Sequence, residues 1–182
     1  IIDTAQAYGD SEAIIARFLE DYPEHPFGVI TKLDKRIRAS DAESIRAGIN
    51  KCHKNFGRPL SGIMFHDSEA LSLLNEDGRK VIRQCINSGI VAAFGISVYT
   101  PEEFRTALSE NIIDIIQAPF NVLDRRLLED GLLDHALGLG KKVFLRSVYL
   151  QGLLLMEPSD LPPILTYATQ TIISWRRLCK KY

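Results

Sequence analysis

A strand, a helix and a second strand follow one another in the first 32 residues, which read IIDTAQAYGDSEAIIARFLEDYPEHPFGVITK. β-branched runs stand at both ends of this stretch, at residues 1–3 and 28–32. Between them the apolar side chains recur at helical period, and Asp10-Ser11 supplies polar residues that favour a helix start. The stretch therefore predicts one strand–helix–strand unit of about 30 residues.

The same alternation continues along the rest of the chain. Further β-rich runs predict strands at residues 62–66, 91–97, 113–118 and 142–147. Amphipathic stretches predict helices between them and a last helix over residues 164–178, while Ser40-Asp41 and Thr100-Pro101 have the composition of helix starts. Strands that alternate with helices pair in parallel through right-handed crossovers.

A parallel α/β chain forms either a barrel or a doubly wound sheet. The doubly wound dinucleotide fold requires G-x-G-x-x-G after its first strand, and this motif is absent. A closed barrel has eight strands and usually about 250 residues, whereas this chain has 182. We therefore predict an incomplete parallel (β/α) barrel of the TIM type, with about six of the eight strands. It forms a single domain over residues 1–182, with one weak break at residues 156–163.

Composition narrows the range of partners. The chain has 23 acidic and 22 basic residues, so its charges nearly balance. It has no basic run that would suggest binding to nucleic acid or to an anionic membrane surface. The longest apolar stretches are strand-sized, well short of the roughly 20 residues that a membrane helix needs. The three cysteines show no C-x-x-C spacing, which favours thiols in a reducing cytoplasm over a metal site. The chain lacks an initiator Met and begins inside a strand, so we expect its natural start to be missing.

Polar residues stand at the carboxyl ends of the predicted strands, where the active site of a parallel barrel lies. Each has a structural explanation when taken alone, such as a turn acid, a packed tyrosine, a solvated lysine or a core histidine. Their coincidence at one end of successive strands favours a shared site. The residues are Asp3, Tyr8 in the following loop, Lys32, His66, Ser97, Gln117, Arg146 and Ser147.

Four of these residues could form a general-acid site. A tyrosine hydroxyl with a pKa of about 10 is a poor acid at neutral pH, and a neighbouring ammonium such as that of Lys32 would lower this pKa. Asp3 would hold Lys32 in its charged form, and His66 would donate to a carbonyl oxygen. Because no activated nucleophile or metal-binding motif accompanies Tyr8, the site suits a cofactor that brings its own nucleophile, such as hydride.

These residues lie in motifs that resemble the aldo/keto reductase family. The resemblance runs in order from the first residue to about residue 155 and is specific as a set. The matching segments are Ile2-Asp3-Thr4-Ala5-Gln6-Ala7-Tyr8-Gly9-Asp10-Ser11-Glu12, Val29-Ile30-Thr31-Lys32, Met64-Phe65-His66-Asp67, Phe94-Gly95-Ile96-Ser97, Ile116-Gln117-Ala118-Pro119-Phe120-Asn121 and residues 146–154.

The resemblance implies a catalytic tetrad of Asp3, Tyr8, Lys32 and His66, in which Tyr8 donates the proton. It also implies NADPH bound across the barrel mouth, and substrates that are aldehydes, ketones or sugars, without a metal. Four cofactor-binding residues follow from it: Ser97 and Gln117 at the nicotinamide carboxamide, Arg146 against the nicotinamide ring, and Ser147.

The resemblance further equates the six strands with the family's second to seventh. The first and eighth would be missing, and with the eighth a region that grips the cofactor's adenosine phosphate. We therefore expect weak NADPH binding by this chain alone. The sequence leaves two alternatives open: a non-catalytic cofactor-binding or regulatory protein on the same fold, and an unrelated barrel isomerase or lyase that uses Lys32 as a Schiff-base amine. It does not determine the substrate or the oligomeric state.

Overall fold

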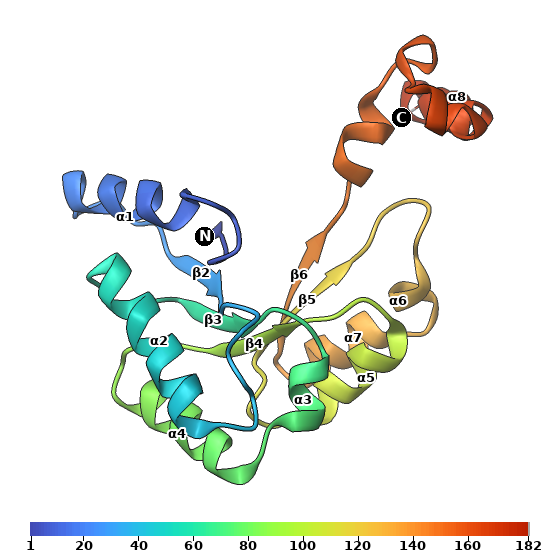
Figure 1. Cartoon of the computed structure of the whole chain (residues 1–182). Helices are drawn as coiled ribbons and strands as arrows, with labels where there is room; N and C mark the ends of the chain where they lie inside the picture. The colour runs from blue at the N-terminus through green and yellow to red at the C-terminus, as the bar shows by residue number, and fades with distance from the viewer. Residues whose placement is uncertain (182) are drawn as a thin grey trace. The chain divides into compact units, whose positions relative to one another are not determined.

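A computed structural model describes residues 1–181 (Figure 1). Its six strands form one sheet in chain order, and the pairs from β1 to β5 are parallel. This order confirms the predicted fold class, an α/β chain whose strands build an incomplete barrel. The strands are β1 (Ile2–Asp3), β2 (Val29–Lys32), β3 (Gly62–Phe65), β4 (Phe94–Ser97), β5 (Ile115–Pro119) and β6 (Lys142–Arg146).

Helices connect the consecutive strands (Figure 1). The α-helices are α1 (Ser11–Asp21), α2 (Ala42–Phe56), α3 (Glu69–Leu73), α4 (Glu76–Asn87), α5 (Pro101–Ser109), α6 (Arg126–Glu129), α7 (Leu132–Gly138) and α8 (Thr169–Lys181). Three 3-10 helices lie near the end of the chain: η1 (Leu150–Leu155), η2 (Pro158–Asp160) and η3 (Pro163–Ala168). In the described residues 1–181, no helix is both long and apolar enough to cross a lipid bilayer.

The central strands of the sheet are continuously buried, whereas β1 and β6 at its two edges have exposed residues. All residues of β2, β3 and β4 are buried. Apolar residues of β2, β3 and β5 contribute to the core, in which Ile30, Met64, Ala93 and Ile115 pack as one cluster with Phe144 beside them. This burial explains why the strands read as apolar runs, and why the polar residues at their ends stood out.

Helix starts agree with the predicted capping residues in two cases out of three. The Asp41 side chain accepts hydrogen bonds from the Glu43 and Ser44 N–H groups at the start of α2. Thr100 and Glu103 form a reciprocal capping box at the start of α5. Asp10 precedes α1 but its side chain forms no capping bond.

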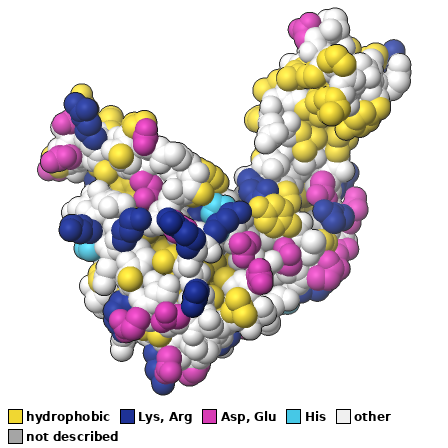
Figure 2. All heavy atoms as spheres, viewed as in Figure 1, with side chains coloured by type: hydrophobic (Ala, Val, Ile, Leu, Met, Phe, Trp, Pro, Cys, Tyr) yellow, Lys and Arg dark blue, Asp and Glu magenta, His cyan; other side chains and the backbone are white. Residues whose placement is uncertain are grey.

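The chain divides into two compact units. The first comprises residues 1–118 and 126–144, and the second comprises residues 119–125 and 145–182, of which Tyr182 lies outside the described residues. The second unit has its own small core of Leu154, Leu161 and Ile172. Figure 2 shows further hydrophobic side chains on its visible surface. In this unit the Ile164 and Tyr167 side chains are both 81% exposed.

Two predicted elements begin three or more residues later than expected. The strand expected at residues 91–97 begins only at Phe94, because Val91 forms an isolated bridge with Leu60. The last helix, expected over residues 164–178, begins at Thr169 and is preceded by η3. Pro162 and Pro163 start that 3-10 segment, since proline favours the first turn of a helix and excludes its interior. The prediction of a single domain stays a prediction.

Candidate active site

A buried ion pair joins the first two strands. Lys32 at the end of β2 donates from Nζ to Asp3 Oδ1 at 2.8 Å. The Lys32 side chain is only 2% exposed, whereas that of Asp3 is 38% exposed. Because an unpaired ammonium is costly to bury, Asp3 is the partner that allows a lysine at this position in the core.

Tyr8 approaches the same ammonium from the loop between β1 and α1. Lys32 Nζ lies 3.5 Å from the Tyr8 hydroxyl, the upper limit of a hydrogen bond, and 5.2 Å from the centre of its ring. The Tyr8 side chain is about half exposed. Backbone hydrogen bonds shape its loop, from the Tyr8 N–H to Ala5 O and from the Ser11 N–H to Tyr8 O. The Tyr8 hydroxyl is thus placed between a buried positive charge and solvent.

His66 lies beside the Tyr8 ring. It directly follows β3, the next strand of the sheet after β2. The centres of the Tyr8 and His66 rings are 6.4 Å apart, and the ring planes meet edge to face at 79°. The structure therefore brings the four predicted catalytic side chains to one end of three adjacent strands. Their roles in a reaction remain predictions.

Two buried polar residues lie further along the same end of the sheet. Ser97 of β4 and Gln117 of β5 are register partners, and both are buried. Gln117 donates from Nε2 to Asp3 Oδ2 at 3.0 Å. Asp3 is thus held by Lys32 on one oxygen and by Gln117 on the other. This bond links β1 to β5, which are not neighbours in the sheet, because the sheet curves as a barrel does.

Sequence reasoning did not foresee the Asp3–Gln117 bond. Gln117 was assigned only to the cofactor, on the strength of the family resemblance. A hydrogen bond between residues 114 positions apart leaves no local signal in the sequence. The other two predicted cofactor residues, Arg146 and Ser147, belong to the second compact unit, and their cofactor contacts stay predictions.

Sequence reasoning also missed a buried carboxylate behind the site. Glu12, in the first turn of α1, is only 8% exposed. Thr31 donates from Oγ1 to Glu12 Oε1 at 2.6 Å, and Asn55 donates from Nδ2 to Glu12 Oε2 at 3.4 Å. A polar residue on the inner side of an amphipathic helix was the one signal that could have revealed it.

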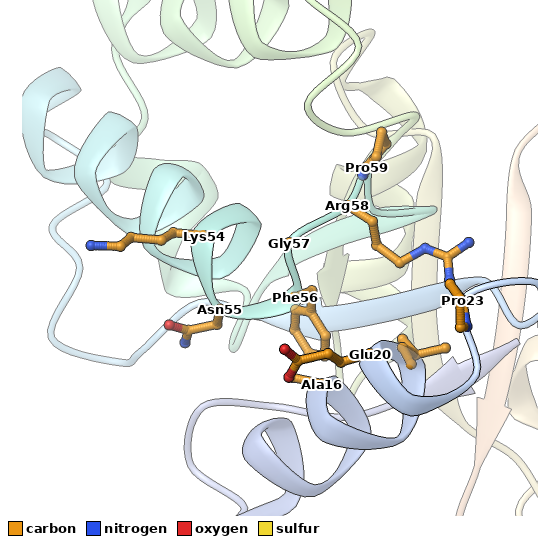
Figure 3. A pocket seen from close by; sticks show the side chains of 10 residues that line it. Ala16, Glu20, Pro23, Lys54, Asn55, Phe56, Gly57, Arg58 and Pro59 are labelled. Atoms are coloured by element: carbon orange, nitrogen blue, oxygen red, sulfur yellow. The ribbon is translucent and has the colours of Figure 1, made fainter.

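A separate cavity of about 680 Å³ lies at the carboxyl ends of α1 and α2 (Figure 3). Its lining carries charges of both signs, from Glu20, Lys54 and Arg58. None of the predicted site residues lines it. We assign this cavity no role in the chemistry of the strand ends.

The arrangement at the strand ends suits proton donation to an oxygen. The Lys32 ammonium lies beside the Tyr8 oxygen, on which negative charge would develop as its proton leaves. A positive charge already held in place there stabilises such a transition state. Among residues 1–181, no group of three His, Cys, Asp or Glu side chains is arranged to hold a metal ion.

Solved structures similar to this chain are aldo-keto reductases of low sequence identity. A holo-form enzyme from Bacillus halodurans superposes with a TM-score of 0.71 at 19% identity, over 88% of this chain and 56% of that one. An aldo/keto reductase from Klebsiella pneumoniae in complex with NADP and acetate has a TM-score of 0.67 at 14% identity, over 93% of this chain and 60% of that one. A glycerol dehydrogenase from Gluconobacter oxydans has a TM-score of 0.65 at 22% identity, over 89% of this chain and 52% of that one.

These likenesses show the fold, and this chain spans less than two thirds of the length of each of the three structures. A search of curated proteins finds no match. The model of the aldo/keto reductase family matches residues 1–181, nearly the whole sequence. The chain therefore belongs to the aldo/keto reductase family.

Proposed function

We propose that this chain carries the proton-donating site of an NADPH-dependent reductase that acts on an aldehyde, ketone or sugar carbonyl. The observation that carries the proposal is the position of Lys32 Nζ, 2.8 Å from Asp3 Oδ1 and 3.5 Å from the Tyr8 hydroxyl. Membership of the family adds support. Three free cysteines, Cys52, Cys85 and Cys179, are compatible with a reducing cytoplasm as its location.

Each side chain of the tetrad has a distinct task in this proposal. Tyr8 donates its hydroxyl proton to the substrate's carbonyl oxygen, which gains negative charge during reduction. Lys32 stabilises the charge left on the Tyr8 oxygen, and Asp3 holds the Lys32 ammonium in place. His66 donates a hydrogen bond to the same carbonyl oxygen and orients the substrate.

The buried polar residues fit a nicotinamide cofactor. Ser97 and Gln117 present a hydroxyl and a carboxamide side by side at the strand ends, and a carboxamide group of the cofactor could pair with both. When bound, NADPH supplies the hydride for the carbonyl carbon. Arg146 and Ser147 are proposed as cofactor-binding residues on the strength of the family motif alone. The Klebsiella structure, solved with NADP, makes the same cofactor a reasonable first choice here.

The proposal is tested by comparing the Tyr8→Phe variant with the parent protein. Oxidation of NADPH is followed by its absorbance with a panel of aldehydes, ketones and sugars. We expect Tyr8→Phe to lower turnover by about 10²- to 10⁴-fold, because the general acid is lost, while NADPH affinity is retained. Tyr22→Phe is the matched control, since Tyr22 lies at the end of α1 and packs against Phe18.

Equal turnover by Tyr8→Phe and the parent protein would remove Tyr8 from its proposed role. NADPH binding without turnover of any carbonyl in the parent would favour the non-catalytic alternative. Trapping of a substrate on Lys32 by borohydride would favour the Schiff-base alternative.

A further inference from the structure

We propose that Glu12 is a positioning residue whose bond to Thr31 sets the distance between the Tyr8 hydroxyl and Lys32. The proposal rests on the proposed function, in which Tyr8 is the proton donor. Glu12 does not touch the reacting groups. It acts through a set of four side chains, Thr4, Ser11, Glu12 and Thr31, which we call the polar clamp.

Stability alone does not explain a buried hydrogen-bond acceptor at this position. Both Glu12 oxygens accept hydrogen bonds from neutral donors, Thr31 and Asn55, and within residues 1–181 Glu12 forms no ion pair. Asn55 comes from the last turn of α2 (Figure 3). Burying a carboxylate without a cation disfavours folding. The neighbouring Cys52 side chain is also buried. Its burial, aided by the charge of Glu12, raises the pKa of the Cys52 thiol to about 12.

The bond from Glu12 holds β2 at the residue before Lys32. Successive side chains of a strand point to opposite faces. Lys32 meets Asp3 and Tyr8 on one face, while Thr31 meets Glu12 of α1 on the other. The Glu12–Thr31 bond therefore fixes the backbone beneath Lys32 without contacting the Lys32 ammonium.

The same residues close the loop that carries Tyr8. The hydroxyls of Thr4 and Ser11, at the two ends of the loop, are hydrogen-bonded at 2.8 Å. Ser11 directly precedes Glu12, and the Gln6 N–H donates to Lys32 O at 3.2 Å. The loop is thus closed on itself, and its far end is attached to β2 through Glu12.

Tyr8 needs this support because little else restrains its hydroxyl. The Tyr8 side chain is 49% exposed, and its contact with Lys32 is already at the limit of a hydrogen bond. A shift of about 1 Å in a reacting group can cost on the order of 10²-fold in rate. Loss of the polar clamp therefore acts on proton transfer, which sets kcat, more than on substrate binding.

The test compares three changes at the clamp with a control. Glu12→Leu/Thr31→Val replaces both partners with apolar groups of similar size, a change that is nearly neutral for folding. Glu12→Gln keeps an oxygen that accepts the Thr31 bond. Thr31→Ser keeps the donating hydroxyl and loses only a methyl group, so it separates loss of the bond from loss of side-chain volume. Glu43→Gln is the control, an exposed acid in the first turn of the neighbouring helix α2.

We expect the double variant to keep the parent's Tm while its kcat falls about 10- to 100-fold and its KM changes little. Glu12→Gln, Thr31→Ser and Glu43→Gln should stay close to the parent kcat. In ligand-free protein with ¹³C-labelled tyrosine, the Tyr8 ring signal, assigned by its absence in Tyr8→Phe, should shift in the double variant alone.

Two outcomes overturn the positioning role. One is a double variant with the parent's kcat and an unmoved Tyr8 signal. The other is a loss of kcat that follows a loss of Tm across all the clamp variants, which indicates a structural role. If Tyr8→Phe itself retains activity, the proposed function fails, and the Tyr8 signal still decides whether Glu12 positions that ring.

Discussion

Lys32 and Asp3 share one ion pair but differ in their access to water. The Lys32 side chain is almost fully buried, while the Asp3 side chain is more than a third exposed. Asp3 has a second hydrogen bond, from Gln117. Asp3 without Lys32 would still be hydrated and hydrogen-bonded, whereas Lys32 without Asp3 would be a buried charge without a counter-ion. The two partners are therefore unequal in their effect on folding.

At this residue scale we predict that Asp3→Asn destabilises the protein more than Lys32→Met. Removing the carboxylate charge should lower the free energy of unfolding by about 3 kcal/mol, because a buried ammonium is left uncompensated. Lys32→Met should cost about 1 kcal/mol or less. Urea denaturation at neutral pH measures both. Asp34→Asn, in a surface pair with Arg36, is the control and should cost under about 1 kcal/mol. A larger loss for Lys32→Met than for Asp3→Asn would contradict this account.

At the scale of the element, β4 and β5 approach so closely that one position excludes a side chain. A Cβ added at Gly95 would lie 2.5 Å from the backbone oxygen of Ile115 and 2.9 Å from Met64 Cγ. The backbone atom cannot move without shifting β5, the strand that carries Gln117. Glycine at this position therefore permits the strand spacing on which the site depends.

We predict that Gly95→Ala lowers the free energy of unfolding by about 1–3 kcal/mol, as overpacking of a core does. Gly138→Ala is the matched control, because no atom lies within 4 Å of a Cβ built at Gly138 in the last turn of α7. That change should stay within about 0.5 kcal/mol of the parent. Chemical denaturation of the two variants compares them directly, and similar values would show that β4 and β5 tolerate the extra methyl group.

The start of α5 should show a dependence on pH. Burial acts to raise the pKa of Glu103, but hydrogen bonds from the Tyr99 N–H, the Ser68 hydroxyl and the Thr100 N–H outweigh it and lower the pKa. A lowered pKa in the folded state means that the Glu103 carboxylate stabilises the fold. This contribution is present above the unfolded value of about 4.3 and is lost as the pH falls through the lower folded value.

We therefore predict that Glu103→Gln is less stable than the parent by about 1 kcal/mol at neutral pH. The difference should shrink as the pH falls below about 4. Thermal unfolding from pH 7 to pH 3 measures it. Glu102→Gln, an exposed neighbour in the same first turn, should show little difference at any pH. A stability difference between Glu103→Gln and the parent that grows as the pH falls would contradict the stabilising role assigned to this carboxylate.

At the scale of the whole molecule, each of the two compact units has a core of its own. The second unit has the small cluster of Leu154, Leu161 and Ile172, against which Trp175 packs. Trp175 is the only tryptophan in the chain, and its Nε1 donates to Leu154 O at 3.1 Å. Its fluorescence therefore reports on the second unit, while far-UV circular dichroism reports on the helices of both units.

We predict that the two probes will not coincide during urea unfolding. The Trp175 transition should occur at a lower urea concentration than the main circular dichroism transition, since a smaller buried apolar area gives less stability. Trp175→Phe is the control and should remove the early fluorescence signal while retaining the main transition. Coincident transitions for both probes would instead indicate cooperative two-state unfolding of the entire chain.

Local features of the chain were predictable from the sequence. The six strands, the Asp41 and Thr100 caps and the polar strand ends have local signals in the sequence, so periodicity and residue type are enough to recognise them. The family motifs were equally readable as ordered segments. The exact strand starts were not, because pairing with a neighbour, as at Val91, decides where a strand begins.

The sequence by itself determined which elements form and which residues stand at the strand ends. The tertiary structure alone decided what those residues contact. The bonds from Gln117 to Asp3 and from Thr31 to Glu12 join segments that are distant along the chain, and they form only because the sheet curves and α1 packs against it. Contacts of this kind depend on the path of the whole backbone, which no local pattern encodes.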